Sequence, residues 1–190
     1  MEHVMSLEEQ MIEYAKCCKD PVYFMRKYCF IQHPLKGKIK FNLFDFQERA
    51  LSFIRDHRLA GILKGRQLGI STLIAGYCLW LMLFHDDKNI LVIAISQKTA
   101  KNLVLKVREM VKLLPSFLTV ETESWNLTSI RFKNGSQIQA ATASPDSARS
   151  EALSLLIMDE AAFLDNDYSI WTGASSTLGT GGQAIMLSTP

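Results

Sequence analysis

The sequence has few cysteines and few histidines, and those present do not form a metal-binding pattern. Its 190 residues include four cysteines and four histidines. None of the cysteines forms a C-x-x-C pair, and no cluster of histidines accompanies them. The pattern therefore favours reduced, mostly buried thiols, as in cytosolic proteins. The cysteines are Cys17, Cys18, Cys29 and Cys78.

Signals for export and for membrane insertion are also missing. Met1-Glu2-His3 is soon followed by acidic residues, and it lacks the basic start and apolar core of a signal peptide. The longest apolar stretch, residues 73–84, is too short to cross a bilayer and is interrupted by Gly76 and Tyr77. We therefore expect a buried helix there and no membrane partner.

Neither sign of charge dominates, and the chain is apolar enough to be globular. The 21 basic and 19 acidic residues give a net charge of +2, and hydrophobic residues make up 48%. Such a balance does not indicate a nucleic-acid partner, although it leaves room for a local basic surface.

From residue 59 onward, apolar runs alternate with helical patterns. Continuous apolar strands separated by helices indicate a parallel sheet buried on both faces, which is an α/β fold. Asn134-Gly135 lies between residues 129–132 and 137–141 and predicts a β-hairpin. The other expected strands are residues 59–63, 90–95, 153–158 and 184–188, and the expected helices are residues 70–84 and 97–114.

The first 57 residues are expected to form an N-terminal helical extension, and residues 58–190 the core. Ser6 and Glu9 have the spacing of a capping box that opens a helix. Asp20-Pro21 starts a second helix, and Asp45 is expected to cap a third. The helices cover residues 7–19, 21–30 and 46–57, with a loop or hairpin at residues 33–40.

A glycine-containing turn between an apolar run and a helical pattern carries the strongest functional signal. It is the segment Leu63-Lys64-Gly65-Arg66-Gln67-Leu68-Gly69-Ile70-Ser71-Thr72. A strand, a turn and a helix N-terminus form an anion site, because unpaired backbone N–H groups and the helix dipole point at the bound phosphate. The usual pattern is G-x-x-x-x-G-K-[ST]. We expect residues 64–72 to bind nucleotide, with Ser71 or Thr72 supplying a hydroxyl to the metal.

This loop lacks the lysine that the pattern requires, because Ile70 occupies its position. Either the loop is inactive or a cation comes from elsewhere. Lys64 and Arg66 are both close enough in sequence to supply that cation.

Two acidic residues follow the apolar run 153–158. Asp159 and Glu160 are expected at the carboxyl end of a buried strand, the edge where ligands bind in open α/β sheets. One carboxylate there can hold Mg²⁺, and its neighbour can orient and deprotonate an attacking water. Such a pair alone could be an ordinary strand end, but after a phosphate loop it indicates nucleotide hydrolysis.

Three weaker features each have an ordinary alternative. Gln47 precedes the first core strand, and its amide could both donate to and accept from adenine, or simply lie at the surface. Arg149, in a polar loop, could reach across a subunit boundary to the γ-phosphate, or be a surface arginine. Ser188-Thr189-Pro190 could sense the γ-phosphate, or form a turn.

Together these motifs resemble the ATPase domain of a tailed-bacteriophage terminase large subunit, the motor that packages DNA into a procapsid. The resemblance implies a P-loop NTPase fold of the RecA/ASCE type, with a mainly parallel central sheet flanked by helices. It covers nearly the whole chain and rests on residues 20–24, 41–47, 65–69, 144–146, 155–163 and 188–190.

By this resemblance, each motif has a role. Asp159 is the magnesium-side carboxylate, Glu160 the catalytic base and Gln47 the adenine contact. Residues 188–190 couple hydrolysis to DNA movement, and Arg149 is a finger that acts in trans. Because some relatives carry the lysine at the start of the loop, Lys64 takes the phosphate-neutralising role, with Arg66 as a second cation.

The resemblance also implies cofactors and partners. They are ATP and Mg²⁺, double-stranded DNA, the portal protein, the terminase small subunit and a homo-oligomeric ring, a pentamer in the family, in the host cytoplasm. Since the chain stops directly after an expected central strand, we expect a fragment without the family's C-terminal nuclease and therefore without DNA cleavage.

Two alternatives remain open. A helicase of the two-domain type shares the strand–loop–helix and Asp-Glu pattern, and would continue into a second RecA-like domain. A catalytically silent nucleotide-binding or assembly module would explain Ile70, whereas the intact Asp159-Glu160 pair argues against it.

Overall fold

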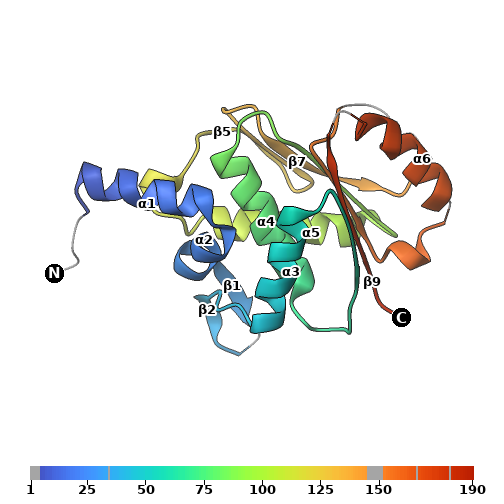
Figure 1. Cartoon of the computed structure of the whole chain (residues 1–190), viewed down its shortest axis with the longest axis horizontal. Coiled ribbons are helices and arrows are strands. Elements are labelled where there is room, and N and C mark those ends of the chain that lie inside the picture. The colour runs from blue at the N-terminus through green and yellow to red at the C-terminus, as the bar shows by residue number, and fades with distance from the viewer. Residues whose placement is uncertain (1–4, 34, 145–151, 166, 180) are drawn as a thin grey trace.

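The chain folds around one large mixed β-sheet (Figure 1). The computed structural model describes residues 5–33, 35–144, 152–165, 167–179 and 181–190. Within them, the seven-stranded sheet has the order β3-β9-β8-β4-β7-β6-β5, and a separate hairpin pairs β1 with β2. The strands are β1 Phe30–His33, β2 Gly37–Lys40, β3 Leu59–Leu63, β4 Asn89–Ala94, β5 Thr122–Trp125, β6 Ser129–Phe132, β7 Gln137–Thr142, β8 Leu155–Asp159 and β9 Gln183–Ser188.

The first five strands of this order run parallel, and β6 and β5 add an antiparallel edge. The central strand β8 is buried along its whole length, as expected for a parallel strand covered on both faces. The hairpin β6–β7 forms at Asn134-Gly135 as predicted, with Gly135 at φ +83°, where a side chain would be strained. A mainly parallel sheet is therefore confirmed.

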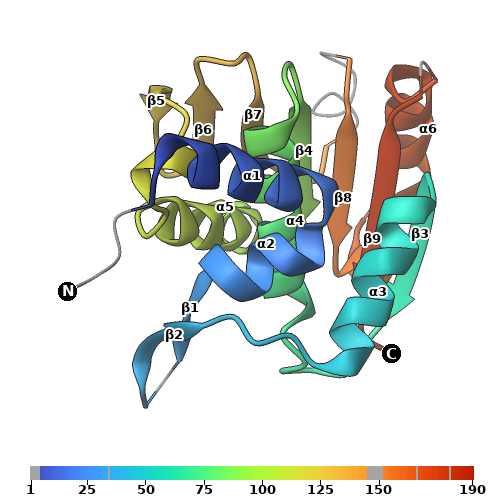
Figure 2. The same cartoon turned by 60° about the vertical axis from the view of Figure 1, so that its left-hand side comes forward.

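Helices cover both faces of the sheet (Figure 2). The helices α1 to α5 lie on one face, and α6 packs on the other against Leu156 and Met158 of β8. This arrangement puts the carboxyl ends of all parallel strands at one edge, beside the N-terminus of α4. The helices are α1 Leu7–Lys19, α2 Pro21–Tyr28, α3 Asp45–Asp56, α4 Ile70–Phe84, α5 Gln97–Val111 and α6 Asp167–Thr177, with short 3₁₀ turns at Ser116–Leu118 and Ala161–Phe163.

Several predicted boundaries were wrong, each for a local reason. The helix expected to reach residue 30 ends at Tyr28, because Phe30–His33 pairs with Gly37–Lys40. The strand expected at 153–158 is Leu155–Asp159, so Asp159 still belongs to the ladder and pairs with β4 and β9. The helix expected at 97–114 ends at Val111.

Two elements were not predicted from the sequence. Helix α6 is rich in serine, threonine and glycine, which are poor helix formers, and it is stabilised by packing of Ile170 and Ala174 on the sheet. Strand β5 has an exposed, polar pattern and depends on its pairing with β6. No helix in the described ranges is long and apolar enough to span a bilayer.

The N-terminal helices share one hydrophobic core with the sheet domain. Phe24 of α2 is fully buried and meets Phe84 of α4 edge-on, with ring centroids 5.3 Å apart. Gly76 of α4 also lies against Met25, because a Cβ there would come within 2.9 Å of the methionine sulfur. The helical extension is thus packed as part of the same folding unit.

Replacing Phe24 with alanine should therefore destabilise the whole chain. We expect a loss of about 3–5 kcal/mol in the free energy of unfolding, as for other buried phenylalanines. Unfolding in urea, followed by circular dichroism and by tryptophan fluorescence, should remain one transition. The control is Leu7→Ala, because Leu7 is 79% exposed and its loss should change stability by less than about 0.5 kcal/mol. Two separate transitions would contradict a shared core.

Candidate functional site

The predicted site residues meet at the carboxyl edge of the sheet. Lys64 follows β3, Thr189 follows β9 and Glu160 follows β8. These three strands are neighbours in the order β3-β9-β8, so side chains far apart in sequence emerge next to one another. This edge is where open α/β sheets bind ligands.

The loop between β3 and α4 has the conformation of an anion site. Gln67 at φ 63° and Gly69 at φ 71° both lie in the left-handed region. Within the described ranges, the N–H groups of residues 65–69 donate to no backbone carbonyl. The carbonyl of Gly69 instead accepts from Thr72 and Leu73, which starts α4. A row of free donors at a helix N-terminus favours a bound phosphate.

Lys64 is held beside the acidic pair. Its backbone N–H donates to the Ser188 carbonyl at 2.9 Å, as in the ladder between β3 and β9. Its Nζ lies 3.0 Å from Oε1 of Glu160, and the Lys64 side chain is only 10% exposed. Lys64 is therefore the loop cation that the structure places at the strand edge.

Glu160 has partners on both carboxylate oxygens. Lys64 binds Oε1, while the backbone N–H and the hydroxyl of Thr189 donate to Oε2 at 3.1 and 3.0 Å. Burial alone would raise the pKa of Glu160, but these hydrogen bonds outweigh it and hold the pKa below its ordinary value. Glu160 also has φ 54°, which is uncommon for a residue with a side chain and occurs often at functional sites.

Asp159 differs from its neighbour because it is buried. It ends β8, is 8% exposed, and its Oδ1 accepts from the Glu160 N–H at 3.1 Å. Burial raises the pKa of Asp159, the positive charge of Lys64 opposes this, and the negative charge of Glu160 adds to it. The two adjacent carboxyls thus have pKa values shifted in opposite directions, a pattern typical of functional sites.

Ser71 and Asp159 would supply a hydroxyl and a carboxylate, the hard oxygen donors that Mg²⁺ prefers. Among the described residues there is no group of three or more His, Cys, Asp or Glu side chains that could hold a metal. Few protein ligands suit Mg²⁺, which keeps several waters and binds substrate phosphates. The donor set therefore fits an ion that would arrive with its nucleotide.

The remaining predicted residues are placed differently. Ile70 is 4% exposed and belongs to the hydrophobic core, so an apolar residue is well suited to this position. Arg66 is exposed and forms no ion pair with any described acidic residue. Arg149 lies outside the described residues. Pro190 is exposed directly after Thr189.

Gln47 contacts the loop itself. Its Oε1 accepts from the Phe44 N–H at 3.0 Å, and its Nε2 donates to the Leu68 carbonyl at 2.9 Å. The residue is 2% exposed. The sequence contained no signal for this contact or for that between Thr189 and Glu160, because each joins segments brought together only by the tertiary fold.

Gly69→Ala should disrupt this loop, whereas Gly65→Ala should not. At Gly69 the left-handed backbone disfavours a side chain by about 1–2 kcal/mol, and a Cβ would come within 2.8 Å of Gln47 Nε2. At Gly65 a Cβ would meet Leu68 at an ordinary 3.5 Å, without a positive φ. We expect Gly69→Ala alone to lower both the melting temperature and nucleotide affinity. Equal effects of the two variants in thermal unfolding and nucleotide titration would contradict this geometry.

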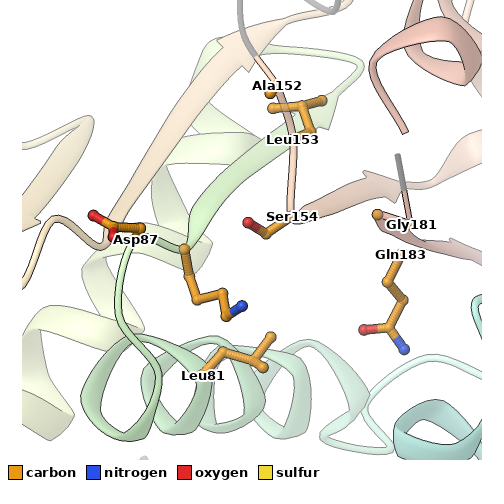
Figure 3. Close-up of a pocket in the computed structure, with 9 residues that line it drawn as sticks. Leu81, Asp87, Ala152, Leu153, Ser154, Gly181 and Gln183 are labelled. Atoms are coloured by element: carbon orange, nitrogen blue, oxygen red, sulfur yellow. The ribbon is translucent and has the colours of Figure 1, made fainter. Parts of the chain in front are cut away.

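A second hollow lies at the opposite edge of the sheet and contains none of the predicted site residues. It measures about 350 Å³ and is lined by residues that precede β4, β8 and β9, among them Lys88, Ser154 and Gly182. Figure 3 shows Leu81 and Ser154 on facing sides of it. The polar groups at the phosphate loop are therefore separate from this cavity.

Known proteins resemble this chain in sequence and in fold. A family profile described as "Terminase large subunit, T4likevirus-type, N-terminal" matches residues 62–190. The crystal structure of the HK97 bacteriophage large terminase has a TM-score of 0.70 and 17% identity, and the match covers 90% of this chain and 37% of that one.

Two other large terminases have the same fold. For the ATPase domain of the Thermus phage P74-26 large terminase, the TM-score is 0.57 and the identity 22%, with 74% of this chain and 64% of that chain covered. For the large terminase of a thermophilic bacteriophage in complex with ADP, these values are 0.57 and 15%, with 78% and 38% covered. The chain spans at most 64% of the length of these three proteins.

The parallel sheet, the phosphate loop and the acidic strand end define a P-loop NTPase fold, which confirms the predicted fold class. Within this class, the chain belongs to the family of T4likevirus-type terminase large subunits, of which it carries the N-terminal part.

Proposed function

We propose that this chain is the ATP-hydrolysing motor domain of a phage terminase large subunit, which drives double-stranded DNA into a procapsid. The observation that carries the proposal is the approach of Lys64 Nζ to Glu160 at 3.0 Å, beside a loop with open N–H groups. The family membership and the structure of a similar large terminase with ADP support a nucleotide at this loop.

The loop and Lys64 would bind the triphosphate. The free N–H groups of residues 65–69 and the N-terminus of α4 would donate to the β- and γ-phosphates. Lys64, already poised at this edge, would exchange its carboxylate partner for a phosphate oxygen. Its charge then neutralises the transferring group, the role that lysine has in other P-loop enzymes. Arg66, at the exposed rim of the loop, would contribute a second positive charge.

Glu160 would act as the base. Its lowered pKa keeps it ionised at neutral pH, so it can accept a proton from the attacking water. Mg²⁺, held by Ser71 and Asp159, would bridge phosphate oxygens and neutralise developing charge. Thr189 fixes Glu160 through two hydrogen bonds, and it belongs to the Ser188-Thr189-Pro190 segment to which we assign coupling of hydrolysis to movement.

The partners follow from this function. They would be double-stranded DNA, the portal protein and the terminase small subunit, with the motor assembled as a homo-oligomeric ring, a pentamer, in the host cytoplasm. In such a ring Arg149 would serve the site of a neighbouring subunit. An isolated subunit would then turn over slowly.

The test is ATP binding and hydrolysis by this chain with Mg²⁺, alone and with double-stranded DNA and portal. We expect binding in both conditions and faster hydrolysis in the second. Binding without hydrolysis in either condition would overturn the proposal in favour of a silent nucleotide-binding module. Strand separation of a labelled duplex would instead indicate a helicase-type translocase.

A further inference from the structure

Gln47 connects the N-terminus of α3 to the phosphate loop. The two ends of its amide have different partners, since Oε1 accepts from Phe44 N–H and Nε2 donates to the Leu68 carbonyl. These partners also settle the orientation of the amide, because an N–H needs an acceptor and a carbonyl needs a donor. With the residue 2% exposed, the amide faces the protein and not an open ligand surface.

The hydrogen bond to Leu68 fixes the direction of the next peptide N–H. In a planar trans peptide, the carbonyl of Leu68 and the N–H of Gly69 point in opposite directions. Because this carbonyl is directed at Gln47, the Gly69 N–H is directed away from the Gln47 amide. That N–H is one of the donors without a backbone partner in the described part of the chain.

Gly69 also leaves no room for this amide to shift. The position that a Cβ of Gly69 would occupy lies 2.8 Å from Gln47 Nε2, so the amide packs directly against the left-handed residue of the turn. The Gln47 side chain thus supports the loop from behind by both a hydrogen bond and close contact.

We propose that Gln47 is a positioning residue for the triphosphate: it orients the Leu68–Gly69 peptide so that the loop is preformed for phosphate, and it does not select the base. This inference rests on the proposed binding of ATP at the loop. It differs from the adenine contact expected from sequence, and the two roles make opposite predictions about which ligands are affected.

The experiment compares ATP, GTP and inorganic tripolyphosphate, each with Mg²⁺, in calorimetric titrations of the chain. Gln47→Glu keeps the size of the side chain but presents an acceptor to the Leu68 carbonyl, and Gln47→Met removes both hydrogen-bonding groups. Under a positioning role, both variants lose about tenfold or more in affinity for all three ligands, by similar factors. Under an adenine-reading role, only ATP is affected.

A control separates positioning from general loss of stability. Leu51→Val changes a fully buried residue of the same helix without touching the loop, and it should lower the melting temperature but leave the three affinities unchanged at temperatures well below it. Each titration is made below the melting temperature of its variant, measured by circular dichroism.

The possible results are distinct. A loss confined to ATP, unchanged affinities in Gln47→Glu and Gln47→Met, or equal affinity losses in Leu51→Val would each overturn the positioning role. If the unmodified chain binds none of the three ligands, the proposed function fails first, and this outcome is recognised without any Gln47 variant.

Discussion

Lys64→Ala is expected to remove nearly all ATP hydrolysis and to weaken nucleotide binding. Lys64 is the cation that the fold holds beside the acidic pair, with its side chain 10% exposed and its Nζ 3.0 Å from Glu160. A group of this kind stabilises charge that develops on the transferring phosphate, and its loss typically costs about 10²–10³-fold in rate. Steady-state turnover with Mg²⁺ and DNA, together with titration of a non-hydrolysable ATP analogue, measures both effects.

Arg66→Ala is the matched control, because it removes a positive charge from the same loop. Arg66 is exposed and lacks an ion pair with the described acidic residues, so solvent already screens much of its charge. We therefore expect a smaller loss than with Lys64→Ala in both assays. An equal or larger loss with Arg66→Ala would assign the missing P-loop cation to Arg66 and contradict the geometry of this site.

Glu160→Gln should separate hydrolysis from binding. Removing the base is expected to slow hydrolysis about 10²–10⁴-fold, the usual contribution of general base catalysis. ATP affinity should be unchanged or higher, because Lys64 loses the carboxylate with which a phosphate must compete. Single-turnover hydrolysis and equilibrium titration report the two quantities independently.

Two further variants test this interpretation of Glu160. Thr189→Val keeps the shape of the side chain but removes the hydroxyl that donates to Oε2 at 3.0 Å, so it should slow hydrolysis less than Glu160→Gln does. Glu123→Gln changes an exposed glutamate that is paired with Arg131, far along the sheet in β5, and should affect neither assay. Weaker ATP binding in Glu160→Gln than in the unmodified chain would show that the carboxylate supports nucleotide binding and does not compete with it.

Several local features could be predicted from the sequence because their causes are close in sequence. The capping box of Ser6 and Glu9 is present with both of its reciprocal hydrogen bonds. The hairpin at Asn134-Gly135 forms as the turn residues require. The helix predicted at residues 70–84 has the same bounds in the structure.

Other features could not be predicted, because they depend on contacts between distant segments. Helix α6 has weak intrinsic helix propensity and forms against the sheet face that β8 and β9 present. The early end of α2 depends on pairing of Phe30–His33 with a strand that follows a turn. The role of Gln47 was open from sequence, where surface and adenine-contact interpretations were equally compatible with its position.

The sequence alone determined which residue types this protein brings to its chemistry: a glycine turn rich in free N–H groups, two carboxyls after a buried strand, and two candidate cations. The reason is that turns, strand ends and helix starts are encoded within a few neighbouring residues. Only the tertiary structure decided which of these residues meet. Placing β9 between β3 and β8 brings Lys64, Thr189 and Glu160 together, while the packing of α4 buries Ile70 in the core and Arg66 stays at the surface. The order of strands in a sheet follows from burial of apolar surface over the whole chain, which no local segment specifies.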